Sequence, residues 1–276
     1  MADLRIHGHG EATVSQLALF TTCGLIWRPM LTGGNPCIGG KMPKNHVKAV
    51  ACAFLLSGAG WMAVAAQAGK AAYPAMAPLD KYLIADETTE IALARSAAPP
   101  SISDGAEVMV LGRDGYKTAA KGTNGFLCIV ERSWAQTDDQ AEFWNPQMRA
   151  PNCFNAQAAR SFVPYYLMKT RLVLAGKSRS EVVQDMARAL DKKELPALEP
   201  GAMAYMMSKQ QYLNDRGKSW HPHAMFFYSG DLTKSWAAND PASPVMVAND
   251  PEQRVTTLFV IADKWSDGTV APPNMP

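Results

Sequence analysis

A secretory signal spanning Met42–Ala68 constrains this chain more than any other feature of its sequence. The segment opens with a short basic stretch and continues as 18 uncharged, mainly apolar residues, 49–66. It ends in Ala66-Gln67-Ala68, the small-x-small pattern that signal peptidase recognises. We therefore predict that the mature protein begins near Gly69 and is periplasmic or secreted, in an oxidising compartment.

The residues that precede the signal, 1–41, show no sustained hydrophobic periodicity. We interpret them as the result of a start codon placed too far upstream, or as a disordered N-terminal extension. The 18 uncharged residues of the leader, 49–66, are nearly long enough to cross a bilayer, and if uncleaved the leader would be the route by which the chain contacts a membrane. Its glycine, serine and alanine content and the cleavage pattern at its end favour removal instead.

The composition from Gly69 to the C-terminus is typical of one globular domain. The whole chain is 47% hydrophobic and 19% charged, which suffices to bury a core over this length. The whole chain has 27 basic and 25 acidic residues, of which five and two precede Gly69. The remaining 22 basic and 23 acidic residues give a net charge near −1. This balance gives nucleic-acid binding no electrostatic basis.

Two cysteines remain after the predicted cleavage, Cys128 and Cys153. An even number of cysteines in an exported chain favours a disulfide bond between them. The alternative is a pair of unrelated buried thiols.

The order of predicted elements is helix, strands, helices and strands. Helices are predicted at 87–95, 156–175 and 179–190, and strands at 107–111, 116–120, 126–130, 202–208, 224–229, 245–248 and 255–262. Short turns join the first three strands and predict an antiparallel meander, and residues 135–155, rich in Asn and Pro, are predicted to form an irregular loop. We therefore predict an α+β fold, a single domain with an antiparallel sheet and its helices packed on one face.

The two histidines that follow the leader, His221 and His223, form the most distinctive pair of side chains. Residues two apart on an extended segment point to the same side, so both imidazoles could bind one divalent metal such as zinc or copper. A carboxylate would have to complete that site, with Glu131, Asp215 and Asp231 as candidates. The alternative is that Trp220 and the histidines form a hydrogen-bonded cap at the mouth of the sheet.

A ligand site is the other possibility at the ends of these predicted strands. Glu131, Arg132 and Trp134 follow the strand at 126–130, where they could line a polar pocket or form a surface ion pair beside a core tryptophan. The candidate ligand-binding residues are Trp220, His221, His223, Glu131, Arg132 and Trp134. The sequence has no Gly-x-Ser-x-Gly motif and no phosphate-binding loop, so no catalytic residue is assigned.

Several stretches together resemble a group of uncharacterised exported bacterial proteins. They are Gly122-Thr-Asn-Gly-Phe126, Val130-Glu-Arg-Ser-Trp134, Asn152-Cys-Phe-Asn155, Gly201-Ala-Met-Ala-Tyr-Met-Met-Ser208 and Trp220-His-Pro-His223. The resemblance covers about Leu79 to Thr269. It implies export and a single domain, and it implies no activity, cofactor or catalytic residue.

The sequence therefore predicts an exported soluble domain that binds a small molecule or a partner protein in the cell envelope. One alternative is a metal-dependent enzyme, a hydrolase or an oxidoreductase, that uses His221 and His223 as ligands. Another is a structural protein of the envelope.

Overall fold

The computed structural model describes residues 72–135, 141–238 and 240–273. All of them belong to one compact unit, Ala65–Pro276. The predicted leader and the residues before it lie outside the described residues. Within the described ranges, the structure contains no helix that combines the length and the apolar character needed to cross a bilayer.

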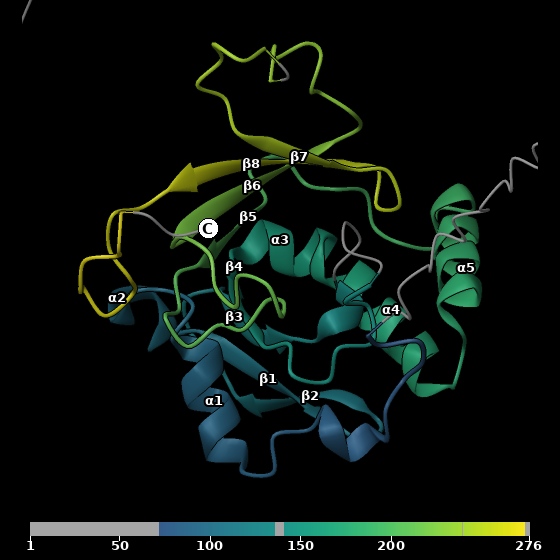
Figure 1. Ribbon diagram of the computed structural model, residues 1–276. Helices are drawn as coiled ribbons and strands as arrows, with labels where there is room; N and C mark the ends of the chain where they lie inside the picture. Colours follow the sequence, from purple (N-terminus) through teal and green to yellow (C-terminus); the bar gives the residue numbers. More distant parts are fainter. Residues whose placement is uncertain (1–71, 136–140, 239, 274–276) are drawn as a thin grey trace, which may run out of the picture. The chain divides into compact units, whose positions relative to one another are not determined.

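In the described residues, eight strands form one sheet that curves around helices α3 and α4 (Figure 1). The strand order is β2-β1-β3-β4-β5-β6-β8-β7, and the pairing is antiparallel except between β1 and β3. The strands are β1 Glu107–Gly112, β2 Gly115–Ala120, β3 Leu127–Glu131, β4 Ala150–Phe154, β5 Met203–Met206, β6 His223–Ser229, β7 Val247–Asp250 and β8 Val255–Ile261. The predicted α+β class with a mainly antiparallel sheet is confirmed.

Side chains cap the first turns of some helices in the described residues. They are α1 Glu87–Arg95, α2 Pro100–Ser103, α3 Ala156–Ser161, α4 Val163–Leu174 and α5 Arg179–Asp191, with 3-10 turns η1 Leu79–Lys81 and η2 Ser133–Ala135. The Asp86 carboxylate accepts hydrogen bonds from the first turn of α1, and Ser178 and Glu181 form a capping box at α5. Pro164 lies in the first turn of α4 and separates it from α3.

The predicted meander is wrong at its third strand, because β3 pairs in parallel with β1 instead of continuing beyond β2. After β2 the chain returns to the start of β1, where a Cβ at Gly122 would lie 2.2 Å from the backbone nitrogen of Glu107. Only glycine allows so close an approach. The strand β3 is apolar on both faces and is buried throughout except at Glu131, whereas no residue of β2 is buried. Burial of both faces of β3 requires a central position in the sheet.

The predicted loop at 135–155 contains a strand that the sequence reasoning missed. This strand, β4, is fully buried and pairs with β3 along its whole length. Its proline, Pro151, cannot donate a hydrogen bond, which normally excludes proline from central strands. Here β5 pairs with β4 only at Cys153 and Phe154, so Pro151 lies beyond that ladder.

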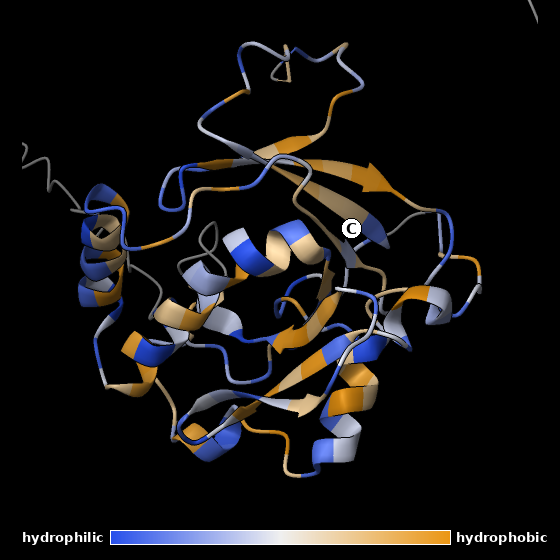
Figure 2. Cartoon of the chain, turned by 180° about the vertical axis from the view of Figure 1, so that it is seen from behind, coloured by the Kyte–Doolittle hydropathy of each residue, from blue (hydrophilic) through white to orange (hydrophobic). Residues whose placement is uncertain are grey.

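Helices cover both faces of the sheet, whereas the sequence predicted one. Val108, Val110 and Cys128 pack with α1 in one apolar cluster. The alternate residues Leu127 and Ile129 belong to a second cluster, which also contains residues of α3, α4 and α5, as the two-residue period of a strand requires. Figure 2 shows the strands largely in hydrophobic colours and α5 largely in hydrophilic ones, as expected for a helix that buries one stripe.

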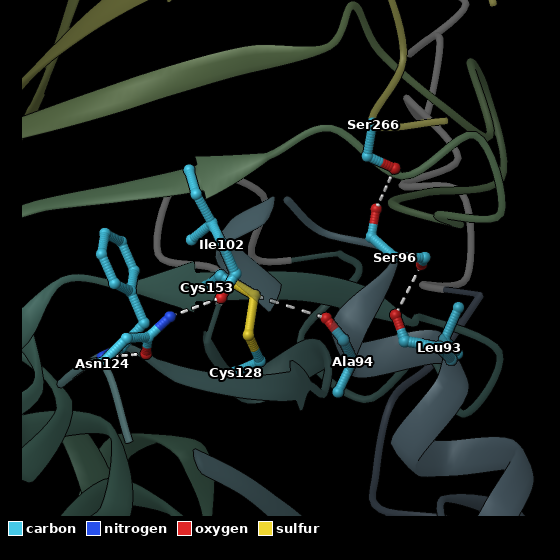
Figure 3. The surroundings of a disulfide bond; sticks show 9 residues. Leu93, Ala94, Ser96, Ile102, Asn124, Cys128, Cys153 and Ser266 are labelled. Carbon is cyan, nitrogen blue, oxygen red and sulfur yellow. Dashed lines mark hydrogen bonds between the residues drawn. A yellow bond between two sulfur atoms is a disulfide. The ribbon is translucent and has the colours of Figure 1, made fainter. Parts of the chain in front are cut away.

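The predicted disulfide bond is confirmed between Cys128 and Cys153. The two residues are direct cross-strand partners on β3 and β4, and both are fully buried. They lie on the sheet face that α1 covers, with the Cys153 sulfur 3.6 Å from the carbonyl oxygen of Ala94 (Figure 3). The bond therefore joins two central strands beneath α1.

Candidate functional site

A cavity of about 380 Å³ opens on the sheet face that packs against α3 and α4. Most of its lining residues lie on the strands, and aromatic and methionine side chains from the strands, helices and loops form much of the wall. The lining residues are Glu131, Ala135, Met148, Ala150, Asn152, Phe154, Phe162, Tyr166, Met206, Leu213, Trp220, His223, Met225, Phe227, Ala248, Asp250, Gln253, Thr257 and Phe259. Both the volume and the predominance of apolar side chains are typical of small-molecule sites.

The strand register determines which residues reach this cavity. Met206 is the cross-strand partner of His223, and Met225 is the partner of Phe259. Because alternate residues of a strand share a face, all four side chains line the cavity wall. The neighbouring strand β4 adds Asn152 on the same face.

Glu131 and Asn152 form the polar part of the wall at β3 and β4. The Asn152 amide nitrogen donates to Glu131 Oε2 over 2.8 Å. Burial raises the pKa of Glu131 to about 7, while the Asn152 hydrogen bond and the nearby Lys169 act in the opposite direction. Near neutral pH this carboxyl group can therefore either donate or accept a hydrogen bond.

The amide oxygen of Asn152 is buried on the cavity wall, yet it has no hydrogen-bond partner among the described residues. The whole residue is only 2% exposed. A buried polar atom without a partner is costly, so a bound molecule with a hydrogen-bond donor would satisfy this oxygen.

His223 and Trp220 form a second part of the wall, at β6. The ring centroids of Trp220 and His223 are 4.7 Å apart. The ring of Phe259, on the neighbouring strand β8, lies 5.5 Å from the His223 ring. His223 Nδ1 lies 2.6 Å from the carbonyl oxygen of His221. Since a carbonyl only accepts, Nδ1 carries the proton and Nε2 is the acceptor nitrogen of the neutral ring.

Burial lowers the pKa of His223 to about 4, despite the hydrogen bond to His221. The imidazole is therefore neutral at neutral pH. Three strand spacings, about 14 Å along the sheet, separate β3 from β6. Glu131 and His223 thus offer two separate polar contacts on one apolar wall.

Arg132 and Trp134 do not line this cavity, contrary to the sequence prediction. Arg132 is fully buried and forms an ion pair of 2.8 Å with Glu90 of α1. Trp134 is also fully buried and donates to the hydroxyl of Thr170 over 2.9 Å. Arg132 follows Glu131 directly, so the two side chains diverge and Arg132 points toward α1.

His221 does not share the cavity wall with His223. It precedes β6, which begins at His223, so the strand alternation that predicted a common direction does not extend to it. Its backbone carbonyl instead accepts from the His223 ring. Within the described ranges, no three His, Cys, Asp or Glu side chains lie in a group that could hold a metal ion. The pairing of His221 with His223 as metal ligands therefore has no support in the geometry.

Replacing Glu131 by glutamine is expected to remove a pH dependence of stability. In the folded wild type the pKa of Glu131 is about 7, above its unfolded value of about 4.5. Between these values the folded state binds the proton more tightly. The free energy of unfolding should therefore fall as pH rises through this window, by about 3 kcal/mol at most.

Urea unfolding at closely spaced pH values measures this effect. The glutamine variant keeps an acceptor for Asn152 and has no carboxyl group to titrate, so its stability should be flatter across the window. Identical profiles for the wild type and the variant would contradict the raised pKa of Glu131.

Comparisons with known proteins do not assign this chain to a family. No family model matches the chain, and neither a curated protein nor a solved structure matches it. The cavity and its residues therefore carry the functional argument.

Proposed function

We propose that this protein binds a small, largely apolar molecule in the cavity between the sheet and helices α3 and α4. The observation that carries the proposal is an apolar cavity of about 380 Å³ whose wall contains the buried, unpartnered amide oxygen of Asn152. An apolar ligand would gain about 25 cal/mol for each Å² of apolar surface removed from water. Asn152, Glu131 and His223 Nε2 would orient it through hydrogen bonds.

We also propose that the protein acts outside the cytoplasm, in the periplasm or as a secreted protein, like the exported bacterial group that its sequence resembles. The disulfide bond between Cys128 and Cys153 supports this, because such bonds persist in oxidising compartments. The cavity favours ligand binding over a structural role in the envelope, because a structural protein would not need an apolar cavity.

Filling the cavity from β7 should weaken binding of an apolar probe. Ala248 lines the cavity, and Ala248→Phe would place a ring in the space that the ligand occupies. We expect the affinity for the neutral dye Nile red, measured by its fluorescence, to fall about tenfold or more.

The matched control is Asn249→Phe, one residue further along β7. Asn249 faces away from the cavity because Ala248 and Asp250 line it. This variant adds the same ring to the same strand and should bind Nile red as the wild type does. Equal weakening by both substitutions, or no binding by the folded wild type, would reject the cavity as the binding site.

A further inference from the structure

A second cavity, of about 470 Å³, adjoins the first. It lies among the C-terminal residues of α5, the segment that follows this helix and the turn between β7 and β8. Phe162 and Gln253 line both cavities. The two spaces therefore share part of their walls.

The two shared residues lie between secondary-structure elements. Phe162 joins α3 to α4 and stacks on Phe227 with ring centroids 4.0 Å apart. Gln253 lies in the turn that connects β7 to β8. Rotation of these side chains would connect the cavities without moving a helix or a strand.

Two cations line the second cavity, Lys193 and Arg254. Both adopt the left-handed backbone conformation, with φ of 56° and 59°, which costs energy in any residue other than glycine. Lys193 forms no ion pair within the described part of the chain. Arg254 pairs with Asp191 over 2.6 Å, and both side chains are more than half exposed. This ion pair therefore contributes little to the stability of the fold.

The rest of the second cavity is largely apolar, with Leu190, Leu195, Leu198 and Val255 in its wall. The nearby carboxylate of Glu252 is already paired with Arg179 at 3.1 Å. A molecule at this position would therefore meet an apolar surface beside two positive charges. That combination suits an anionic group attached to an apolar chain.

We infer that the two cavities together hold one elongated amphiphile. Its mainly apolar chain lies in the first cavity, where a hydroxyl or amide group on the chain would donate to Asn152 Oδ1, and passes between Phe162 and Gln253. Its anionic head, a carboxylate or a phosphate, binds Lys193 and Arg254. This inference rests on the proposed function, because it assigns the chemical class of the same ligand.

Dodecanoate, dodecyl phosphate and dodecanol test the inference, because they share one chain and differ in the head. Binding to the purified protein is measured by isothermal titration calorimetry, below the micelle concentrations of the two anions and below the solubility limit of dodecanol. At least one anion should bind tighter than the alcohol. The double variant Lys193→Gln/Arg254→Gln should weaken that anion about tenfold or more, the loss expected for charge-assisted hydrogen bonds. The affinity for dodecanol should not change.

Matched controls are Lys192→Gln and Lys218→Gln. Lys192 is adjacent to Lys193, and Lys218 shares its left-handed backbone, but neither lines the cavity. Both variants should bind the anion as the wild type does, and a larger loss for phosphate than for carboxylate would identify the head.

Two outcomes would overturn the inference. If dodecanol binds and neither anion binds tighter, or if the double variant loses only thermal stability, the cations do not bind a head and the proposed function stands. If none of the three probes binds the folded protein, both the inference and the proposal of an apolar ligand fail.

Discussion

Replacing Arg132 by leucine is expected to lower the free energy of unfolding by about 3–5 kcal/mol, because it leaves a buried charge without its partner. Arg132 is fully buried and Glu90 is 1% exposed, with 2.8 Å between them. The guanidinium also donates to the carbonyl oxygens of Tyr82, over 2.7 Å, and of Val130. Removing it leaves the buried Glu90 carboxylate without its cation and the Tyr82 carbonyl without this donor, although Leu111 N–H still donates to Glu90 and the Tyr116 hydroxyl still donates to Val130. Urea unfolding of the wild type and the variant measures the loss.

The matched control is Arg113→Leu, which removes an arginine from an ion pair with Asp80 at the surface. Both side chains of that pair are about two thirds exposed, so its loss should cost no more than about 1 kcal/mol. Replacing Glu90 and Arg132 together by leucine should recover part of the stability, because no buried charge then remains. An Arg132→Leu variant as stable as Arg113→Leu would contradict the role assigned to the buried pair.

This pair also shows why part of the candidate site could be predicted and part could not. Polar and aromatic residues at strand ends indicated Glu131, Trp220 and His223, and all three line the cavity. The same signal also selected Arg132 and Trp134, which belong to the core. Strand alternation predicts that Glu131 and its neighbour Arg132 diverge. The sequence does not show whether Glu131 or Arg132 points into the cavity, because that depends on where α1 and α4 pack.

The local elements were predictable because their signals lie within a few residues. The helix caps at Asp86 and Ser178 and the hairpin between Gly112 and Gly115 each depend on residues that are close together in the sequence. The parallel pairing of β3 with β1 depends instead on how two distant faces are buried. No local pattern at residues 127–131 encodes that partner.

Asn152 is one of the cavity residues that the sequence reasoning missed, and a signal for it existed. It stands between Pro151 and Cys153 in a segment that resembles a loop. The predicted bond from Cys153 to Cys128, within an evident strand, implied that 153 lies beside that strand. Extended backbone on both sides of Cys153 then places Asn152 and Phe154 on the opposite face, which is the face that carries the cavity.

Replacing Cys128 and Cys153 together by alanine is expected to lower the free energy of unfolding by about 3.5 kcal/mol. The two cysteines are 25 residues apart in sequence, and a loop of that length restricts the unfolded chain by about this amount in the chain-entropy model. The substitution also removes two buried sulfur atoms from the packing beneath α1. Urea unfolding of the oxidised wild type and the double variant measures the difference.

Reduction separates the effect of the bond from the effect of packing. Reduced wild type keeps both sulfur atoms, so its loss of stability reports the bond alone, and reductant should leave the double variant unchanged. Glu131 and Asn152 lie on the paired strands β3 and β4, and the disulfide bond joins these two strands. Loss of the bond should therefore also weaken Nile red binding at urea concentrations where the reduced protein begins to unfold. Equal stability of the oxidised and reduced wild type would contradict a stabilising role for the bond.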